Sequence, residues 1–101
     1  MRTIASVRLD KQRPALILTR RSALQLLSWV TVAPITSTIR GISTEVSVGP
    51  RNGLDHPSVV SCDNLTTVRG DAVRETIGLF FDDQEEELAL AISDAFQLVL
   101  R

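Results

Sequence analysis

The chain has 101 residues, enough for one compact domain, and this length excludes two-domain and barrel-sized enzyme folds. A hydrophobic fraction of 44%, with 23% charged residues and a net charge of −1, is typical of a chain that fills a core and excludes a disordered tail. One Cys and one His cannot form an internal disulfide or supply a structural zinc site. We therefore expect one domain over residues 1–101, without a metal or other cofactor.

Neither a membrane span nor a leader peptide is predicted. The uncharged stretch over residues 22–39 has about the length of a span, but seven Ser, Thr or Gln residues and one Pro interrupt it. Near the N-terminus, Arg2 and Arg8 interrupt the sequence before an apolar run of signal-peptide length develops. We expect a cytoplasmic protein.

Charge is segregated along the chain. Residues 1–74 carry ten cations and five carboxylates, a net charge of +5, whereas residues 75–101 carry one cation and seven carboxylates, a net charge of −6. Ten of the eleven cations are Arg, whose planar fork suits phosphate. The first part should attract polyanions, although a genomic bias toward GC-rich codons accounts for most of these arginines without a function.

Apolar and β-branched residues predict five or six short strands. Residues 29–35 are β-branched enough for a central strand that ends near Pro34, which leaves Thr36 at the strand exit. Residues 44–48 alternate at the strand period with both valines inward. In chain order, the sequence predicts the end of a strand at Val7 and Leu9, a buried strand over 14–19, a helical turn over 22–27, the central strand, a loop over 36–41, the strand over 44–48, a turn at 52–57, and strands over 58–62 and 76–80.

The C-terminal segment has the apolar stripe of a helix that packs on a core. Asp82 or Asp83 is expected to cap this helix, and the glutamates at 85–87 suit its positive N-terminal end. The acidic cluster could also bind a hard cation, but capping explains it without one. With the strands, this helix predicts a small α+β barrel. The stripe comprises Leu88, Ile92, Ala95, Phe96 and Val99.

Several local strings recur in an order that resembles one known family. They are Arg-Pro-Ala-Leu-Ile-Leu at 13–18, Val-Ala-Pro-Ile-Thr-Ser at 32–37, Thr-Glu-Val at 44–46, Asp-Asn-Leu-Thr-Thr at 63–67 and Ile-Gly at 77–78. Together with the terminal helix, they resemble the MazF/PemK family of toxin endoribonucleases from bacterial toxin–antitoxin systems. The resemblance implies a five-stranded SH3-like barrel of the CcdB/PemK type with flanking helices.

The chain departs from the family pattern at its N-terminus. Family members usually begin with an Arg-Gly-Asp/Glu-hydrophobic-Trp string and carry a long Gly-rich loop between the first two strands, where it helps cover the RNA. This chain begins Met-Arg-Thr-Ile and has only residues 11–13 between the two predicted strands. The shorter loop leaves the sequence preference undetermined, and we expect it to open the site to structured RNA.

The resemblance implies that Arg13 and Thr36 are catalytic. When the ribose 2′-hydroxyl attacks its own phosphate, the crowded, charged phosphorus centre needs hydrogen-bond donors, and a guanidinium fork and a hydroxyl supply them. Arg is a poor base near neutrality. Asp10, three residues before Arg13, could orient the guanidinium or take the proton, or could be a turn residue that bonds its own backbone.

The resemblance, together with these residues, predicts a sequence-specific, metal-independent endoribonuclease toxin that cuts single-stranded RNA, whether mRNA, rRNA or tRNA. A symmetric homodimer and inhibition by a cognate antitoxin are implied by the family. A CcdB-like toxin that binds DNA gyrase without cutting RNA, or a degenerate module that only binds the antitoxin, remain alternatives. The residues expected around the RNA are Lys11, Gln12, Ser37, Thr38, Arg40 and Asn64.

The remaining candidate side chains have structural interpretations. His56, the only imidazole, precedes a proline and is interpreted as a turn residue rather than as a ribonuclease acid. Cys62 ends an apolar strand and is interpreted as an inert core thiol. Trp29 begins the central strand and is expected in the core rather than stacked on a base, and Arg20 and Arg21 are expected to be solvated.

Overall fold

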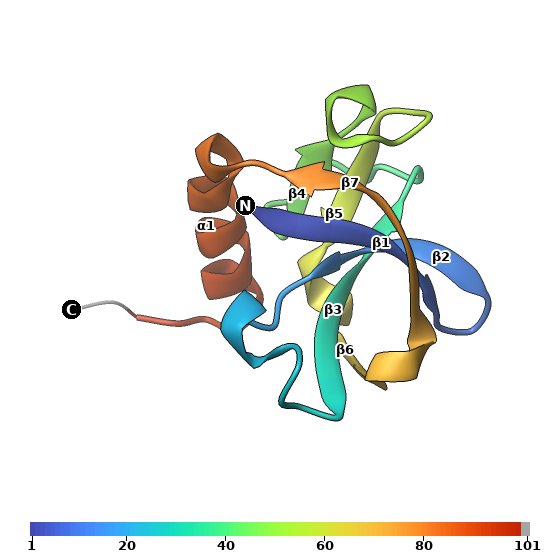
Figure 1. Cartoon of the computed structure of the whole chain (residues 1–101). Coiled ribbons are helices and arrows are strands. Elements are labelled where there is room, and N and C mark those ends of the chain that lie inside the picture. Colours follow the sequence, from blue (N-terminus) through green and yellow to red (C-terminus); the bar gives the residue numbers. More distant parts are fainter. Residues whose placement is uncertain (100–101) are drawn as a thin grey trace.

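Seven antiparallel strands form a strongly curled sheet in the computed structural model, which describes residues 1–99 (Figure 1). Short 3₁₀ turns join the strands, and one helix follows the last strand. Among the described residues, no helix is long and apolar enough to cross a membrane. The elements are β1 Arg2–Arg8, β2 Gln12–Ile17, η1 Arg21–Ala23, β3 Trp29–Thr36, β4 Glu45–Val48, η2 Pro50–Asn52, β5 Ser58–Ser61, η3 Cys62–Asn64, β6 Thr66–Arg69, η4 Gly70–Ala72, β7 Val73–Phe80, η5 Asp82–Gln84 and α1 Glu85–Ala95.

Strand β3 is the centre of the sheet. The strand order is β4-β5-β3-β2-β1-β7, and β6 pairs with β3 outside this path. Along one edge, β3 pairs with β6 over residues 29–32 and with β5 over residues 35–36. Pro34 lies between these two pairings, an interruption that accommodates a residue without an N–H. The predicted small α+β barrel with a C-terminal helix is confirmed, and strand β3 extends two residues beyond the proline to Thr36.

The strand count differs from the prediction because β6 was missed. Its sequence, Thr-Thr-Val-Arg, has three exposed residues and one half-buried residue, so it lacks the apolar alternation that marks a half-buried strand. Strand β7 also begins at Val73, three residues before its predicted start. The prediction placed the start too late because the first half of this strand is mostly exposed. Both segments are strands because of their ladder partners, not because of their own hydrophobicity.

The two faces of the central strands bury different apolar clusters. On one face, the cross-strand row Ile4, Leu16 and Ala33 is fully buried and belongs to the cluster that includes Leu88 and Ala91 of α1. On the opposite face, Ala15 and its alternating neighbours form a smaller cluster. Full burial of a side chain such as Leu16 contributes about 1.5 to 3 kcal/mol, so these two clusters fix the register of the sheet.

Helix α1 is shorter than its predicted stripe. Leu88 is buried, and Ile92 and Ala95 are partly buried, as predicted. The helix ends at Ala95, because Phe96 has left helical geometry and Gln97 adopts a left-handed φ of 53°. The prediction is therefore wrong for Phe96 and Val99, whose relative exposures are 57% and 77%.

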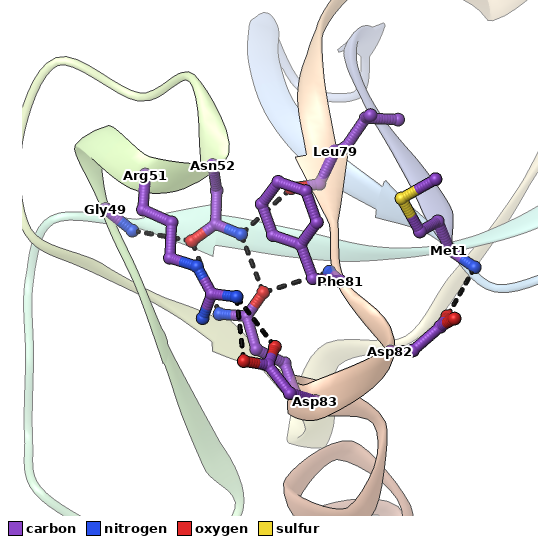
Figure 2. A network of polar contacts seen from close by, with 9 residues as sticks. Met1, Gly49, Arg51, Asn52, Leu79, Phe81, Asp82 and Asp83 are labelled. Carbon is purple, nitrogen blue, oxygen red and sulfur yellow. Dashed lines mark hydrogen bonds and ion pairs between the residues drawn. The ribbon is translucent and has the colours of Figure 1, made fainter.

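The predicted caps of this helix are also wrong. Asp82 binds the α-amino group of Met1 at 2.7 Å, and Asp83 binds Arg51 at 2.8 Å (Figure 2). Gln84 instead accepts a hydrogen bond from the Phe81 backbone N–H at 3.0 Å. The carboxylates of Asp82 and Asp83 therefore form ion pairs with cations that lie far away in the same sequence.

A buried asparagine attaches the η2 turn to the end of β7 (Figure 2). Asn52 is 2% exposed, and its amide donates to the Leu79 carbonyl at 2.9 Å and to Gln84 Oε1 at 2.8 Å. Its oxygen accepts from the Gly49 N–H at 3.1 Å. A Cβ at Gly78 would lie 1.8 Å from the Asn52 backbone oxygen, so only glycine permits this approach.

Gly78→Ala should lower the free energy of unfolding by about 2 to 3 kcal/mol, because the new methyl group separates β7 from the η2 turn. Gly49→Ala is the matched control, since Gly49 has extended backbone and its Cβ would meet nothing nearer than 3.8 Å. Urea unfolding of both variants measures the difference. Equal stabilities would contradict the close packing described above.

Candidate active site

The pairing of β2 with β3 determines which polar residues meet. The register pairs Ala15 with Pro34 and Leu16 with Ala33, and continuing it two residues sets Arg13 opposite Thr36. Arg13 is the second residue of β2, and Thr36 is the last residue of β3. Two residues far apart in the sequence therefore lie at the same end of the sheet, and both line the same two surface hollows.

Asp10 holds the guanidinium of Arg13 in a two-point contact. The Nε and Nη2 atoms of Arg13 donate to the two Asp10 carboxylate oxygens at 2.7 and 3.0 Å. This contact holds the pKa of the Asp10 carboxyl well below its usual range and raises the pKa of Arg13. Both groups remain charged near neutral pH, so the pair orients the arginine.

The Thr36 hydroxyl is positioned by the turn that follows β3. Its Oγ1 accepts a hydrogen bond from the Thr38 backbone N–H at 3.1 Å. The hydroxyl proton is not used in this contact, so it is available for donation to a bound anion. Thr36 and Arg13 can thus present donors to one phosphate group.

Three hollows meet at Thr36. The Asn64 hollow, about 410 Å³, is lined by Asp10, Arg13, Thr36 and Asn64 among others. The Arg40 hollow, about 370 Å³, is lined by Thr36, Thr38, Arg40 and Asn64 among others. The His56 hollow, about 510 Å³, has Arg13, Thr36, Ser37 and His56 in its lining.

The loop that carries Arg40 is held by one carboxylate. Glu45, at the start of β4, accepts hydrogen bonds from the backbone N–H groups of Arg40 at 3.1 Å and Gly41 at 2.8 Å. Gly41 adopts a left-handed φ of 75°, which lets the chain turn around the carboxylate. The loop keeps Arg40 on the wall of its hollow, while Asn64 is fixed by donating to Ser61 Oγ at 2.8 Å.

Four of the six predicted RNA-contacting residues line the hollows, and two do not. Ser37, Thr38, Arg40 and Asn64 are lining residues. In the part of the chain that the structure describes, Lys11 and Gln12 line none of the three. Gln12 instead donates to Ser6 Oγ at 2.8 Å, since strand alternation turns it to the side opposite Arg13.

The fold agrees with the interpretation of Cys62 and disagrees with that of Trp29. Cys62 is buried as predicted, and burial raises the pKa of its thiol to about 11, so it is inert. The core prediction for Trp29 is wrong. This first residue of β3 is 52% exposed, and the Arg69 guanidinium lies 5.5 Å from the centre of its ring.

His56 lies in a turn, as predicted, but no sequence pattern indicated that it lines the same hollow as Arg13 and Thr36. His56 belongs to the lining of the largest of the three hollows. No local pattern signals this position, because it depends on the packing of the η2 turn against β7. The only available signal was chemical: His56 is the single imidazole of the chain.

The model of the PemK-like, MazF-like toxin family of type II toxin–antitoxin systems matches residues 5–96. The chain belongs to this family. It is 52% identical over 98 residues to endoribonuclease MazF3 of Mycobacterium tuberculosis, covering 97% of this chain and 95% of that protein. The solved structure of M. tuberculosis toxin MazF-mt6 matches with a TM-score of 0.95 and 50% identity, covering 97% and 99% of the two chains.

A more distant relative shares the fold. It is a mycobacterial endoribonuclease solved in complex with its cognate antitoxin. The match has a TM-score of 0.86 at 23% identity and covers 98% of this chain and 95% of that one. The curled sheet with its C-terminal helix is therefore the architecture of the toxin family.

Asp10→Asn should lower the rate of RNA cleavage by about tenfold to a hundredfold, because a neutral amide holds the Arg13 guanidinium less firmly. The ratio of wild-type to variant rates should stay constant from about pH 8 to about pH 5. The reason is that the lowered pKa keeps Asp10 ionised until well below this range.

Single-turnover assays across this pH range measure the ratio. A ratio that approaches one at the acidic end would show that Asp10 gains its proton there, which contradicts an orienting role for a permanently charged carboxylate.

Proposed function

We propose that residues 1–101 act as a single endoribonuclease toxin domain that cleaves RNA through attack of a ribose 2′-hydroxyl on the adjacent phosphate. The chain is an RNA-cleaving toxin of its family, as its identity of 52% to an endoribonuclease over nearly the whole length indicates. The cleavage mechanism rests on one observation, that Arg13 and Thr36 line the same two surface hollows at one end of the sheet. The products are a 2′,3′-cyclic phosphate and a 5′-hydroxyl.

The proposed roles follow from the chemistry of the donors. Arg13 offers its remaining guanidinium N–H groups to the non-bridging oxygens, where negative charge develops as phosphorus becomes five-coordinate. Thr36 donates its hydroxyl proton to the same centre. Asp10 orients Arg13 and is too weak a base to take the 2′-proton, because its pKa is lowered. Charge stabilisation by these donors is the main contribution of the site.

The substrate is single-stranded RNA, bound with sequence preference. Bases that are splayed from a stack fit hollows whose polar walls come from Ser37, Thr38, Arg40 and Asn64. Only residues 9–11 separate β1 from β2, so no long loop covers the site from that side. This openness favours loops within folded RNA, such as rRNA or tRNA, besides mRNA. Cleavage of these RNAs in the cytoplasm inhibits translation and growth.

Two protein partners complete the proposal. The first is a cognate antitoxin, whose partly acidic segment competes with RNA for Arg13 and Arg40. The second is another copy of the chain in a symmetric dimer, supported by exposed apolar side chains that include Ile39, Ile42 and Leu90. Nothing in the hollows favours gyrase binding or a purely antitoxin-binding module, the two alternatives from sequence.

In excess EDTA, the purified protein should still cleave RNA, and Arg13→Ala and Thr36→Ala should each lose about a hundredfold or more, since each removes a transition-state donor. Arg13→Lys should also be poor, because it keeps the charge but not the fork. Gel assays with total RNA measure the rates, and circular dichroism controls for folding.

Near-wild-type rates in both alanine variants would overturn the assigned roles of Arg13 and Thr36. Activity that disappears with EDTA and returns with Mg²⁺ would overturn the metal-independent mechanism.

A further inference from the structure

The His56 hollow has the composition of a pocket for a flat, partly apolar ring. Its apolar lining is Pro14, Ile35, Leu54 and Ile77, and its charged and polar lining includes Asp55, His56 and Ser37. It opens onto the same Arg13 and Thr36 as the Asn64 hollow, from a different side. Apart from Arg13, Thr36 and Ser37, the residues of this lining have no role in the proposed function, which does not say which base the hollow takes.

The wall that carries His56 is rigid. The η2 turn is attached to β7 through the buried Asn52 (Figure 2), and Gly53, at a φ of 91°, packs against Ile77. After it, Ser58 Oγ donates to the His56 backbone carbonyl at 3.0 Å, and Pro57 restricts the chain between them. These contacts fix the backbone at His56 and leave its imidazole exposed.

The side chains on this wall suit a nucleobase better than a phosphate. Asp55 is an exposed residue of the lining, and its carboxylate would repel phosphate oxygens but can accept hydrogen bonds from an exocyclic amino group, as carboxylates do with cytosine. The imidazole of His56 can stack on a base or hydrogen-bond its edge. The apolar residues of the lining can contact the face of a base. An amino-bearing base matches each of these features.

We propose that the His56 hollow binds the nucleobase on one side of the cleaved bond and that His56 and Asp55 determine the preference for an amino-bearing base there. Since Arg13 and Thr36 hold the phosphate between two hollows, the neighbouring base on the other side occupies the Asn64 hollow. This inference rests on the proposed endoribonuclease function and adds which nucleotides the site reads and where.

Cleavage of a randomised RNA pool, followed by sequencing of the 5′-hydroxyl ends, tests this assignment. Relative to wild type, His56→Ala should reduce the base preference about tenfold at one position next to the cut and leave the other side unchanged. Asn64→Ala should reduce the base preference on the other side of the cut and leave the preference on the His56 side unchanged. Asp55→Asn, which can donate as well as accept, should shift the preference toward keto-bearing bases. Arg20→Ala, an exposed change outside the hollows, should preserve the wild-type pattern.

A His56→Ala pattern identical to wild type, or an equal loss of preference on both sides, would overturn the inference. A second arm separates this failure from failure of the proposed function. The wild-type and His56→Ala proteins select from a random pool of 2′-O-methyl RNA, which cannot be cleaved by 2′-hydroxyl attack. If the wild-type protein leaves the unmodified RNA pool uncut but selects amino-bearing bases from the 2′-O-methyl pool through His56, the nuclease function is contradicted and the role of the hollow is supported. Equal selections by both proteins contradict the role of the hollow.

Discussion

The register between β2 and β3 is the constraint on which the site depends. A slip of one residue would move Arg13 to the other face of the sheet and separate it from Thr36, because side chains alternate along a strand. The buried row of Ile4, Leu16 and Ala33 makes such a slip costly, since it would expose the cluster that α1 covers. The core of this small domain thus also aligns the two residues that are proposed to be catalytic.

The oppositely charged parts of the sequence form ion pairs with each other in the fold. Arg2 and Arg51 bind Glu85 and Asp83, so part of the negative C-terminal segment compensates cations of the first half. Arg2 lowers the pKa of Glu85, which keeps this contact charged under mildly acidic conditions. Arg13 has a local partner in Asp10. The net charge of +5 over residues 1–74 therefore overstates the charge available to RNA, and the position of Arg13 and Arg40 matters more than the sum.

Sequence patterns predicted the elements that bury a regular apolar face. The central strand and the C-terminal helix are examples, and the family resemblance named residues 13 and 36, which the fold brings into the lining of the same two hollows. The patterns failed where contacts between residues far apart in the sequence determine the structure. Strand β6 is polar and is a strand because it pairs with β3. Asp82 and Asp83 bind distant cations instead of capping α1. His56 belongs to the same class, since its position follows from packing between η2 and β7.

The central claim is that the substrate's own 2′-hydroxyl is the nucleophile, with Arg13 and Thr36 stabilising the charge that forms. A short RNA cut at one mapped bond, compared with the same RNA carrying a single 2′-deoxy sugar before that bond, tests the claim directly. Mass spectrometry should find a 2′,3′-cyclic phosphate and a 5′-hydroxyl from the RNA and no cleavage of the substituted bond. Cleavage of the 2′-deoxy substrate, or products with a 5′-phosphate, would contradict it.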